Sequence, residues 1–109
     1  MVAPTFSLYG AGQPSPPLVY TASKAALVGM ARWIAVRYAR LGIRCNVVSP
    51  AGIDESPWPR GGFKRRYLRQ VPLGRAVSVA EVARAILYAI ESEHLSGQNL
   101  VLDGAWTSV

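Results

Sequence analysis

Residues 20–41 carry the strongest helical pattern in this chain. No proline interrupts the stretch, helix-forming residues dominate it, and Gly42 stands where a C-terminal cap belongs. Two apolar stripes run along it, the first made of Leu27, Met30, Ile34, Tyr38 and Leu41 and the second of Ala22, Ala25, Ala26, Gly29, Trp33 and Val36. A helix that is apolar on two faces has to be covered on two sides. We expect a sheet on one side and, on the other, a second subunit of a homo-oligomer.

The rest of the chain alternates between strand and helix patterns. Residues 1–19 are rich in proline and glycine and favour a loop after at most a short initial strand. Residues 43–50 and 98–102 are typical of strands, and a helix over 79–92 lies between them. This order predicts an α/β fold with a parallel sheet of about three strands, and two to three helices.

A long connection, residues 53–75, separates the strand 43–50 from the last helix. It is rich in proline and glycine, with a short helix expected from Phe63 to Gln70. Connections this long in compact proteins are usually lids or binding loops. Ser78 and Glu81 then have the spacing of a capping box, which would start the helix over 79–92. At 109 residues, one hydrophobic core and a single domain over 1–109 are expected.

The chain carries 12 Lys and Arg against 6 Asp and Glu, a formal charge of +6. Part of the charge gathers in the long connection, at Arg60, Lys64, Arg65, Arg66 and Arg69. No nucleic-acid-binding motif accompanies it, so nucleic acid is not the expected partner. A solvated face is favoured over contact with an acidic substrate.

No apolar run reaches the roughly 18 residues of a membrane-spanning helix, so we expect no membrane insertion and a cytoplasmic protein. Cys45 is the only cysteine and lies in a strand pattern, which predicts a small buried core residue and excludes a disulfide within the chain. His94 is a lone histidine near a helix end, expected at the surface. No metal site is predicted.

Tyr20 and Lys24 are four residues apart, so on a helix their side chains share one face and can approach one ligand together. A nearby ammonium favours the phenolate form of a tyrosine, which would suit the pair to proton exchange near neutral pH. The spacing alone is common by chance and fits the start of a buried helix better than a catalytic pair.

Several segments at fixed distances from this pair favour the first interpretation. Ser7-x-x-Gly10 precedes Tyr20 by thirteen residues, YTASKAAL surrounds the pair, and GIRCNVVSPAGI and VPLGRAVSVAEVARAILYAI lead to LSGQNLVLDGAW. Together they resemble the C-terminal half of the short-chain dehydrogenase/reductase family over essentially all 109 residues. The resemblance implies half of a Rossmann-like, doubly wound parallel sheet. It also implies an NAD(P)-dependent oxidoreductase that transfers hydride between nicotinamide and a small carbonyl or alcohol substrate.

By the same resemblance, Tyr20 is the general acid/base, Lys24 favours its phenolate and bonds the nicotinamide ribose, and Ser7 orients the substrate oxygen. Hydride transfer to a carbonyl builds negative charge on oxygen, which a positioned donor stabilises. Taken without the tyrosine, Ser7 is equally compatible with a turn residue.

The family's loop after the Asn-containing strand approaches the nicotinamide through its backbone, and here that loop consists of Pro50, Ala51, Gly52 and Ile53. It departs from the usual Pro-Gly, because the glycine comes one place later. The threonine that is common shortly afterwards is absent, and Glu55 and Ser56 occupy the region. Asn46, inside the strand, is interpreted as structural, bonding backbone between strands.

The glycine-rich turn of a Rossmann unit, with an acidic residue about 20 positions on, does not occur in the sequence. We therefore expect that the N-terminal nucleotide-binding half is absent, that the chain is truncated or partial, and that it binds NAD or NADP weakly alone. The strand carrying Ser7 would then have an open edge. Two alternatives stay open: a non-enzymatic fragment that docks on full-length homologous subunits, and a basic nucleic-acid-binding fragment.

Overall fold

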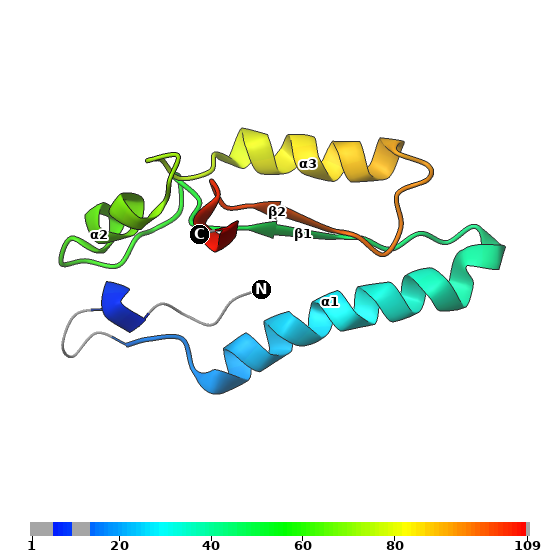
Figure 1. Cartoon of the computed structure of the whole chain (residues 1–109), viewed down its shortest axis with the longest axis horizontal. Coiled ribbons are helices and arrows are strands. Elements are labelled where there is room, and N and C mark those ends of the chain that lie inside the picture. The colour runs from blue at the N-terminus through cyan, green and yellow to red at the C-terminus, as the bar shows by residue number, and fades with distance from the viewer. Residues whose placement is uncertain (1–5, 10–13, 109) are drawn as a thin grey trace.

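The computed structural model describes residues 6–9 and 14–108 and has an α/β arrangement around a small parallel sheet (Figure 1). In chain order its elements are the 3-10 helix η1 (Phe6–Leu8), α1 (Leu18–Tyr38), the 3-10 helix η2 (Ala39–Leu41), β1 (Val47–Pro50), α2 (Phe63–Gln70), α3 (Val79–Glu91), β2 (Asn99–Leu102) and the 3-10 helix η3 (Trp106–Ser108). Helix α3 lies along one side of the sheet and α1 along the other. The predicted α/β class is therefore confirmed.

The sheet in the described part of the chain has two parallel strands, paired from Val47 with Asn99 to Pro50 with Leu102. The third expected strand falls on N-terminal residues, of which 1–5 lie outside the described ones. Ser7 itself lies in η1, so a strand at Ser7 was a wrong prediction. A proline- and glycine-rich surrounding favours such a turn over a strand. Among the described residues, β1 has β2 as its one strand neighbour.

Only the last four residues of the predicted strand 43–50 join the sheet. Before them, a side chain makes the connection: Asn46 Oδ1 accepts from the Gln98 amide over 3.0 Å, and Nδ2 donates to the Leu95 carbonyl over 2.8 Å. The structural role expected for Asn46 is confirmed. Cys45 was expected in the core but is half-buried, because it precedes the ladder and only its backbone is engaged, by Ser96 and Gly97.

Helix α1 begins two residues earlier than predicted, directly after Pro17, and closes through η2 on Gly42. Gly42 has φ 73°, the left-handed conformation of a helix cap, and its amide bonds the Ala39 carbonyl over 2.9 Å. The predicted cap is thus confirmed.

The face of α1 that packs inward differs from both predicted stripes. The buried residues are Ala31 and Ala35, which belong to neither. A Cβ on Gly97 would lie 3.4 Å from the Ala35 Cβ, so small side chains allow the loop before β2 to approach the helix closely. Ile34 and Tyr38 are half-buried, whereas Trp33 and Val36 are 61% and 81% exposed. Among residues 6–9 and 14–108, one side of α1 is covered and the other is left open.

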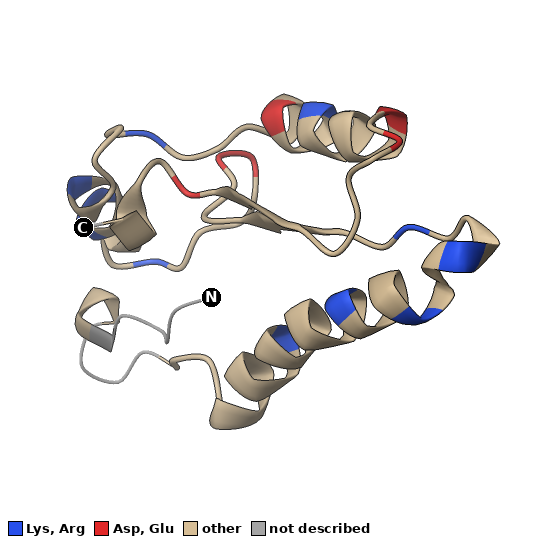
Figure 2. Ribbon diagram, turned by 45° about the vertical axis from the view of Figure 1, so that its right-hand side comes forward, with Lys and Arg blue, Asp and Glu red and all other residues tan. Residues whose placement is uncertain are grey.

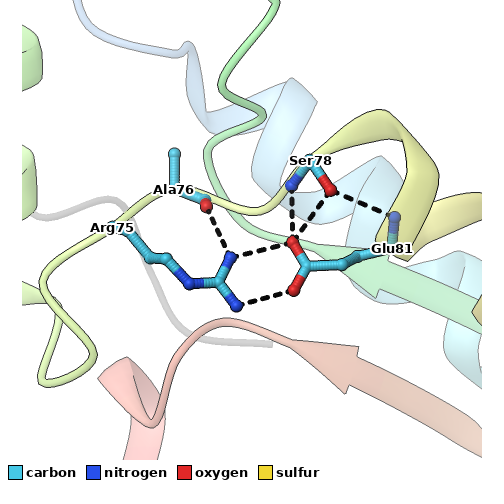
Figure 3. A network of polar contacts seen from close by, with 4 residues as sticks. All are labelled: Arg75, Ala76, Ser78 and Glu81. Atoms are coloured by element: carbon cyan, nitrogen blue, oxygen red, sulfur yellow. Dashed lines mark hydrogen bonds and ion pairs between the residues drawn. The ribbon is translucent and has the colours of Figure 1, made fainter.

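Helix α3 starts at the predicted capping box (Figure 3). The Glu81 amide donates to Ser78 Oγ over 3.2 Å, and Glu81 Oε2 accepts from the Ser78 amide over 2.9 Å. Arg75 adds two bonds to the same carboxylate, of 2.7 and 2.9 Å. These contacts fix the turn that carries the chain from α2 back to the sheet.

Candidate active site

The segments that carry the predicted site residues Ser7, Tyr20, Lys24 and Pro50–Ile53 lie toward one end of the molecule. Both strands point their carboxyl ends toward the side that holds α2, η1, η3 and the first turn of α1 (Figure 1). In parallel α/β sheets, ligands bind outside the carboxyl ends of the strands. This end is therefore where a site is expected.

Tyr20 and Lys24 lie together on the first two turns of α1. The Lys24 ammonium stands 5.6 Å from the centroid of the Tyr20 ring, and Tyr20 is 52% exposed. The helix start is held by the Pro17 carbonyl, which accepts from the Tyr20 amide over 3.0 Å, and by Ser23 Oγ, which donates to the Tyr20 carbonyl over 2.8 Å. The pair thus sits on a rigid element, with the tyrosine open to a ligand.

Ser7 lies in η1, which packs against α2, and its side chain is exposed. Among the described residues, no hydrogen bond joins Ser7 to Tyr20 or Lys24. Its neighbour Leu8 anchors the segment, since it is 2% exposed and its carbonyl accepts from Arg66 Nε over 3.0 Å.

Tyr9 connects this segment to α2. Its ring lies 5.1 Å from that of Phe63. Burial raises the pKa of Tyr9 above its usual value, and the nearby Tyr20 raises it further. Tyr9, a residue that the sequence did not single out, therefore packs the segment of Ser7 against α2.

The loop Pro50–Ile53 leaves the carboxyl end of β1 and is held on two sides. The Ala51 amide donates to the Leu102 carbonyl over 3.0 Å. Beyond it, Ile53 and Val77 form a parallel bridge. The Val77 amide donates to the Gly52 carbonyl over 3.1 Å, and the Asp54 amide donates to the Val77 carbonyl over 2.8 Å. The loop is thus an ordered continuation of the sheet edge.

Aromatic side chains pack over this loop, and the sequence did not assign them to the site. The Gly52 amide donates to the Tyr67 hydroxyl over 2.8 Å, and the Trp58 and Tyr67 ring centroids are 5.0 Å apart. Gly52 has no room for a side chain, because a Cβ there would lie 2.3 Å from Trp58 Cη2 and 2.9 Å from Tyr67 Cζ. The close packing of the Trp58 and Tyr67 rings thus requires a glycine at position 52. The available signal was the four-residue spacing of Phe63, Tyr67 and Val71, which marks one buried face of α2.

Glu55, which occupies the region where the family commonly has a threonine, has a structural partner. Its Oε2 accepts from the Val79 amide at the start of α3 over 3.1 Å. A carboxylate is favourable at a helix N-terminus, where backbone amides lack partners. The departure from the family pattern therefore ties the loop to α3.

The basic cluster of the long connection divides into two groups. Figure 2 shows basic residues on α1 and α2 and acidic ones at the ends of α3. Lys64 pairs with Asp54 over 2.6 Å, and Arg66 donates to the Leu8 and Gly61 carbonyls, so these two tie the connection together. Arg60, Arg65 and Arg69 are more exposed than these two. His94 is exposed too, and the described residues contain no cluster of three or more potential metal ligands.

Comparison with known proteins identifies the architecture. The family model described as "Enoyl-(Acyl carrier protein) reductase" matches residues 2–107. Carbonyl reductase family member 4 of Danio rerio is 42% identical over 86 residues, which are 79% of this chain and 36% of the relative. The chain belongs to the short-chain dehydrogenase/reductase family. The human protein named 3-oxoacyl-[acyl-carrier-protein] reductase is 40% identical over the same share of each chain.

Solved structures of the family agree. The short-chain dehydrogenase of Leptospira borgpetersenii, solved with bound NAD+, superposes with a TM-score of 0.81 and 28% identity, over 97% of this chain and 39% of that one. This short-chain dehydrogenase/reductase chain spans about a third of the length of the curated relatives that it matches. Among the described residues, no helix is both long and apolar enough to span a bilayer.

Proposed function

We propose that this chain supplies the catalytic residues of an NAD(P)-dependent oxidoreductase that interconverts a small carbonyl compound and its alcohol. The observation that carries the proposal is the Tyr20–Lys24 pair, exposed on the first turns of α1 at the carboxyl end of the sheet. Family membership supports oxidoreductase chemistry, and a family structure with bound NAD+ supports the cofactor class.

In this proposal Tyr20 moves the proton. Its hydroxyl donates to the substrate oxygen on reduction and takes the proton back on oxidation, while the Lys24 ammonium stabilises the phenolate between the two. Ser7 orients the substrate oxygen from η1, where its side chain is exposed. When bound, the nicotinamide supplies or accepts the hydride.

The loop Pro50–Ile53 suits a backbone contact with the cofactor. Val77 bonds the Gly52 carbonyl and the Asp54 amide. The Ile53 amide, which lies between these two groups in the chain, therefore points away from Val77. Among the described residues that amide meets no acceptor. It is therefore available to a polar group such as a carboxamide, in accord with the role proposed for Pro50, Ala51, Gly52 and Ile53.

The test is NAD(P)H-linked carbonyl reduction by the complete protein encoded in the reading frame that contains these residues. Tyr20→Phe should lower kcat/KM by about 100-fold or more, the usual contribution of a general acid/base. Tyr88→Phe, which removes an exposed hydroxyl from α3, is the matched control. A Tyr20→Phe rate within a factor of a few of the wild type would refute the proposed role.

A second candidate function is a non-enzymatic fragment that docks on full-length homologous subunits. The open face of α1 favours it, because Trp33 and Val36 are 61% and 81% exposed on a helix that ends in an ordered cap. Co-purification of the 109-residue chain with a full-length homologue, together with no reductase activity in the complete reading frame, would support docking over catalysis.

A further inference from the structure

The bonding of the loop 50–54 leaves two neighbouring amides in very different situations. Backbone acceptors hold the amides on either side, Ala51 to Leu102 and Asp54 to Val77. The Gly52 amide has no backbone acceptor and instead donates to the Tyr67 hydroxyl over 2.8 Å. The Ile53 amide meets no acceptor among the described residues. The Tyr67 hydroxyl therefore holds the Ala51–Gly52 peptide, which directly precedes the peptide of the unbonded Ile53 amide.

Packing holds the Tyr67 ring rigidly in place. Tyr67 is 4% exposed and belongs to the buried cluster with Leu8, Phe63 and Val71. The Trp106 ring meets it edge-on with centroids 4.9 Å apart. Burial raises the pKa of Tyr67 above its usual 10.0, so the hydroxyl is neutral at physiological pH and the bond to Gly52 does not depend on titration there. A bonding group locked in this way can preorganise the backbone that it supports.

Gly52 and Tyr67 also fit each other sterically. Any side chain at position 52 would enter the space of Trp58 Cη2 and the Tyr67 ring, at 2.3 and 2.9 Å from the Cβ. The connection 53–75 is tied back to the same place, because Trp58 Nε1 donates to the Asp54 carbonyl over 3.2 Å and Lys64 pairs with the Asp54 carboxylate. Helix α2 and the loop therefore form one packed unit.

We propose that Tyr67 is a positioning residue for the nicotinamide. Its hydroxyl fixes the Gly52 amide, the Val77 amide holds the Gly52 carbonyl on the other side of the same residue, and together they keep the following Ile53 amide oriented toward the cofactor. The inference rests on the proposed function, because it takes the loop 50–53 as the cofactor contact. Tyr67 acts through the backbone and does not touch the reacting atoms.

The experiment compares Tyr67→Phe with Tyr88→Phe in the complete protein. Phenylalanine keeps the ring in its cluster and removes only the oxygen, while Tyr88→Phe removes an exposed hydroxyl from α3. We expect Tyr67→Phe to speed hydrogen–deuterium exchange at the Gly52 amide by roughly fivefold or more, which corresponds to the loss of one net hydrogen bond. We also expect the Kd for NAD(P)H to rise several-fold, while the melting temperature stays within a few degrees of the control.

The outcomes separate the two claims. If exchange at Gly52 is the same in both variants, the positioning role is wrong whatever the activity. If exchange rises and the wild type binds NAD(P)H, an unchanged Kd in Tyr67→Phe also overturns it. If the wild type binds neither NADH nor NADPH, the proposed function fails and with it any role of Tyr67 toward a cofactor. Faster exchange together with weaker cofactor binding, both absent in Tyr88→Phe, supports the inference.

Discussion

The guanidinium of Arg44, just ahead of strand β1, donates a hydrogen bond of 2.7 Å to the carbonyl of Leu95, in the loop that leads into β2. The same group bonds the carbonyls of Ala89 and Ile90 over 2.9 and 2.7 Å. These two belong to the last turn of α3, whose final carbonyls have no partner within the helix. Arg44 thus joins the end of α3 to the entry of both strands at the end of the sheet opposite the candidate site.

Loss of the Arg44 side chain should destabilise the fold. Arg44→Met keeps much of the aliphatic stem and removes three charge-assisted bonds, so we expect the free energy of unfolding to fall by about 2 kcal/mol. Arg44→Lys should recover only part of it, because an ammonium cannot span three carbonyls as a planar guanidinium does. Denaturant unfolding followed by circular dichroism measures both. Arg40→Met, at an exposed position of η2, is the control and should change stability by less than about 0.5 kcal/mol.

Glu81 predicts a specific loss of stability in acid. The Arg75 guanidinium, followed by the Ser78 backbone and hydroxyl, holds the pKa of this carboxylate far below its ordinary 4.5. A lowered pKa in the folded state stabilises the protein above pH 4.5, and this contribution is lost as the pH falls from there toward the folded-state pKa. Unfolding midpoints at pH 7, 5 and 3 should therefore show a difference between wild type and Glu81→Gln that shrinks at pH 3. Glu93→Gln, at an exposed position after α3, is the control, and an equal trend in both variants would contradict the assignment.

Ala105 occupies a backbone conformation that favours glycine. Its φ is 72°, and it directly follows Gly104, which has a φ of 62°. A left-handed conformation costs a residue with a Cβ roughly 1–2 kcal/mol, of which glycine's extra freedom in the unfolded chain offsets a part. We expect Ala105→Gly to raise the free energy of unfolding by about 0.5–1 kcal/mol in chemical denaturation. Ala83→Gly, inside α3, should instead lower it by about 1 kcal/mol, and a loss of similar size in both variants would rule out strain at Ala105.

Local sequence signals predicted the helices well. The capping box of Ser78 and Glu81, the cap at Gly42 and helix α2 all depend on residues within a few positions of one another. Such contacts are encoded in spacing, so a sequence pattern is sufficient to locate them. The tyrosine–lysine pair on α1 belongs to the same class, since four helical residues bring the two side chains together.

Contacts between residues far apart in the sequence could not be predicted from such local patterns. Tyr67 reaches Gly52 from a different element, and Arg44 replaces strand pairing with bonds to carbonyls about fifty positions away. The inward face of α1 was misassigned because Ala31 and Ala35 are weak hydrophobic signals. Small side chains are needed at this face of α1 because Gly97 approaches it closely, and the sequence periodicity of α1 does not show that approach.

The open face of α1 should mediate self-association. Trp33 and Val36 stand 61% and 81% exposed on it, together with Ala22, Ala26 and Gly29 from the second stripe predicted by the sequence. Small residues beside an exposed tryptophan allow a second helix to approach, and burial of such a surface is favourable by about 25 cal/mol per Å². We expect Val36→Glu to lower the molar mass of the complete protein in light scattering coupled to size exclusion, without loss of helical circular dichroism. Arg65→Glu introduces the same side chain at an exposed position of α2 and should leave the molar mass unchanged. A Val36→Glu protein that keeps the wild-type mass would show that the open face is not the interface.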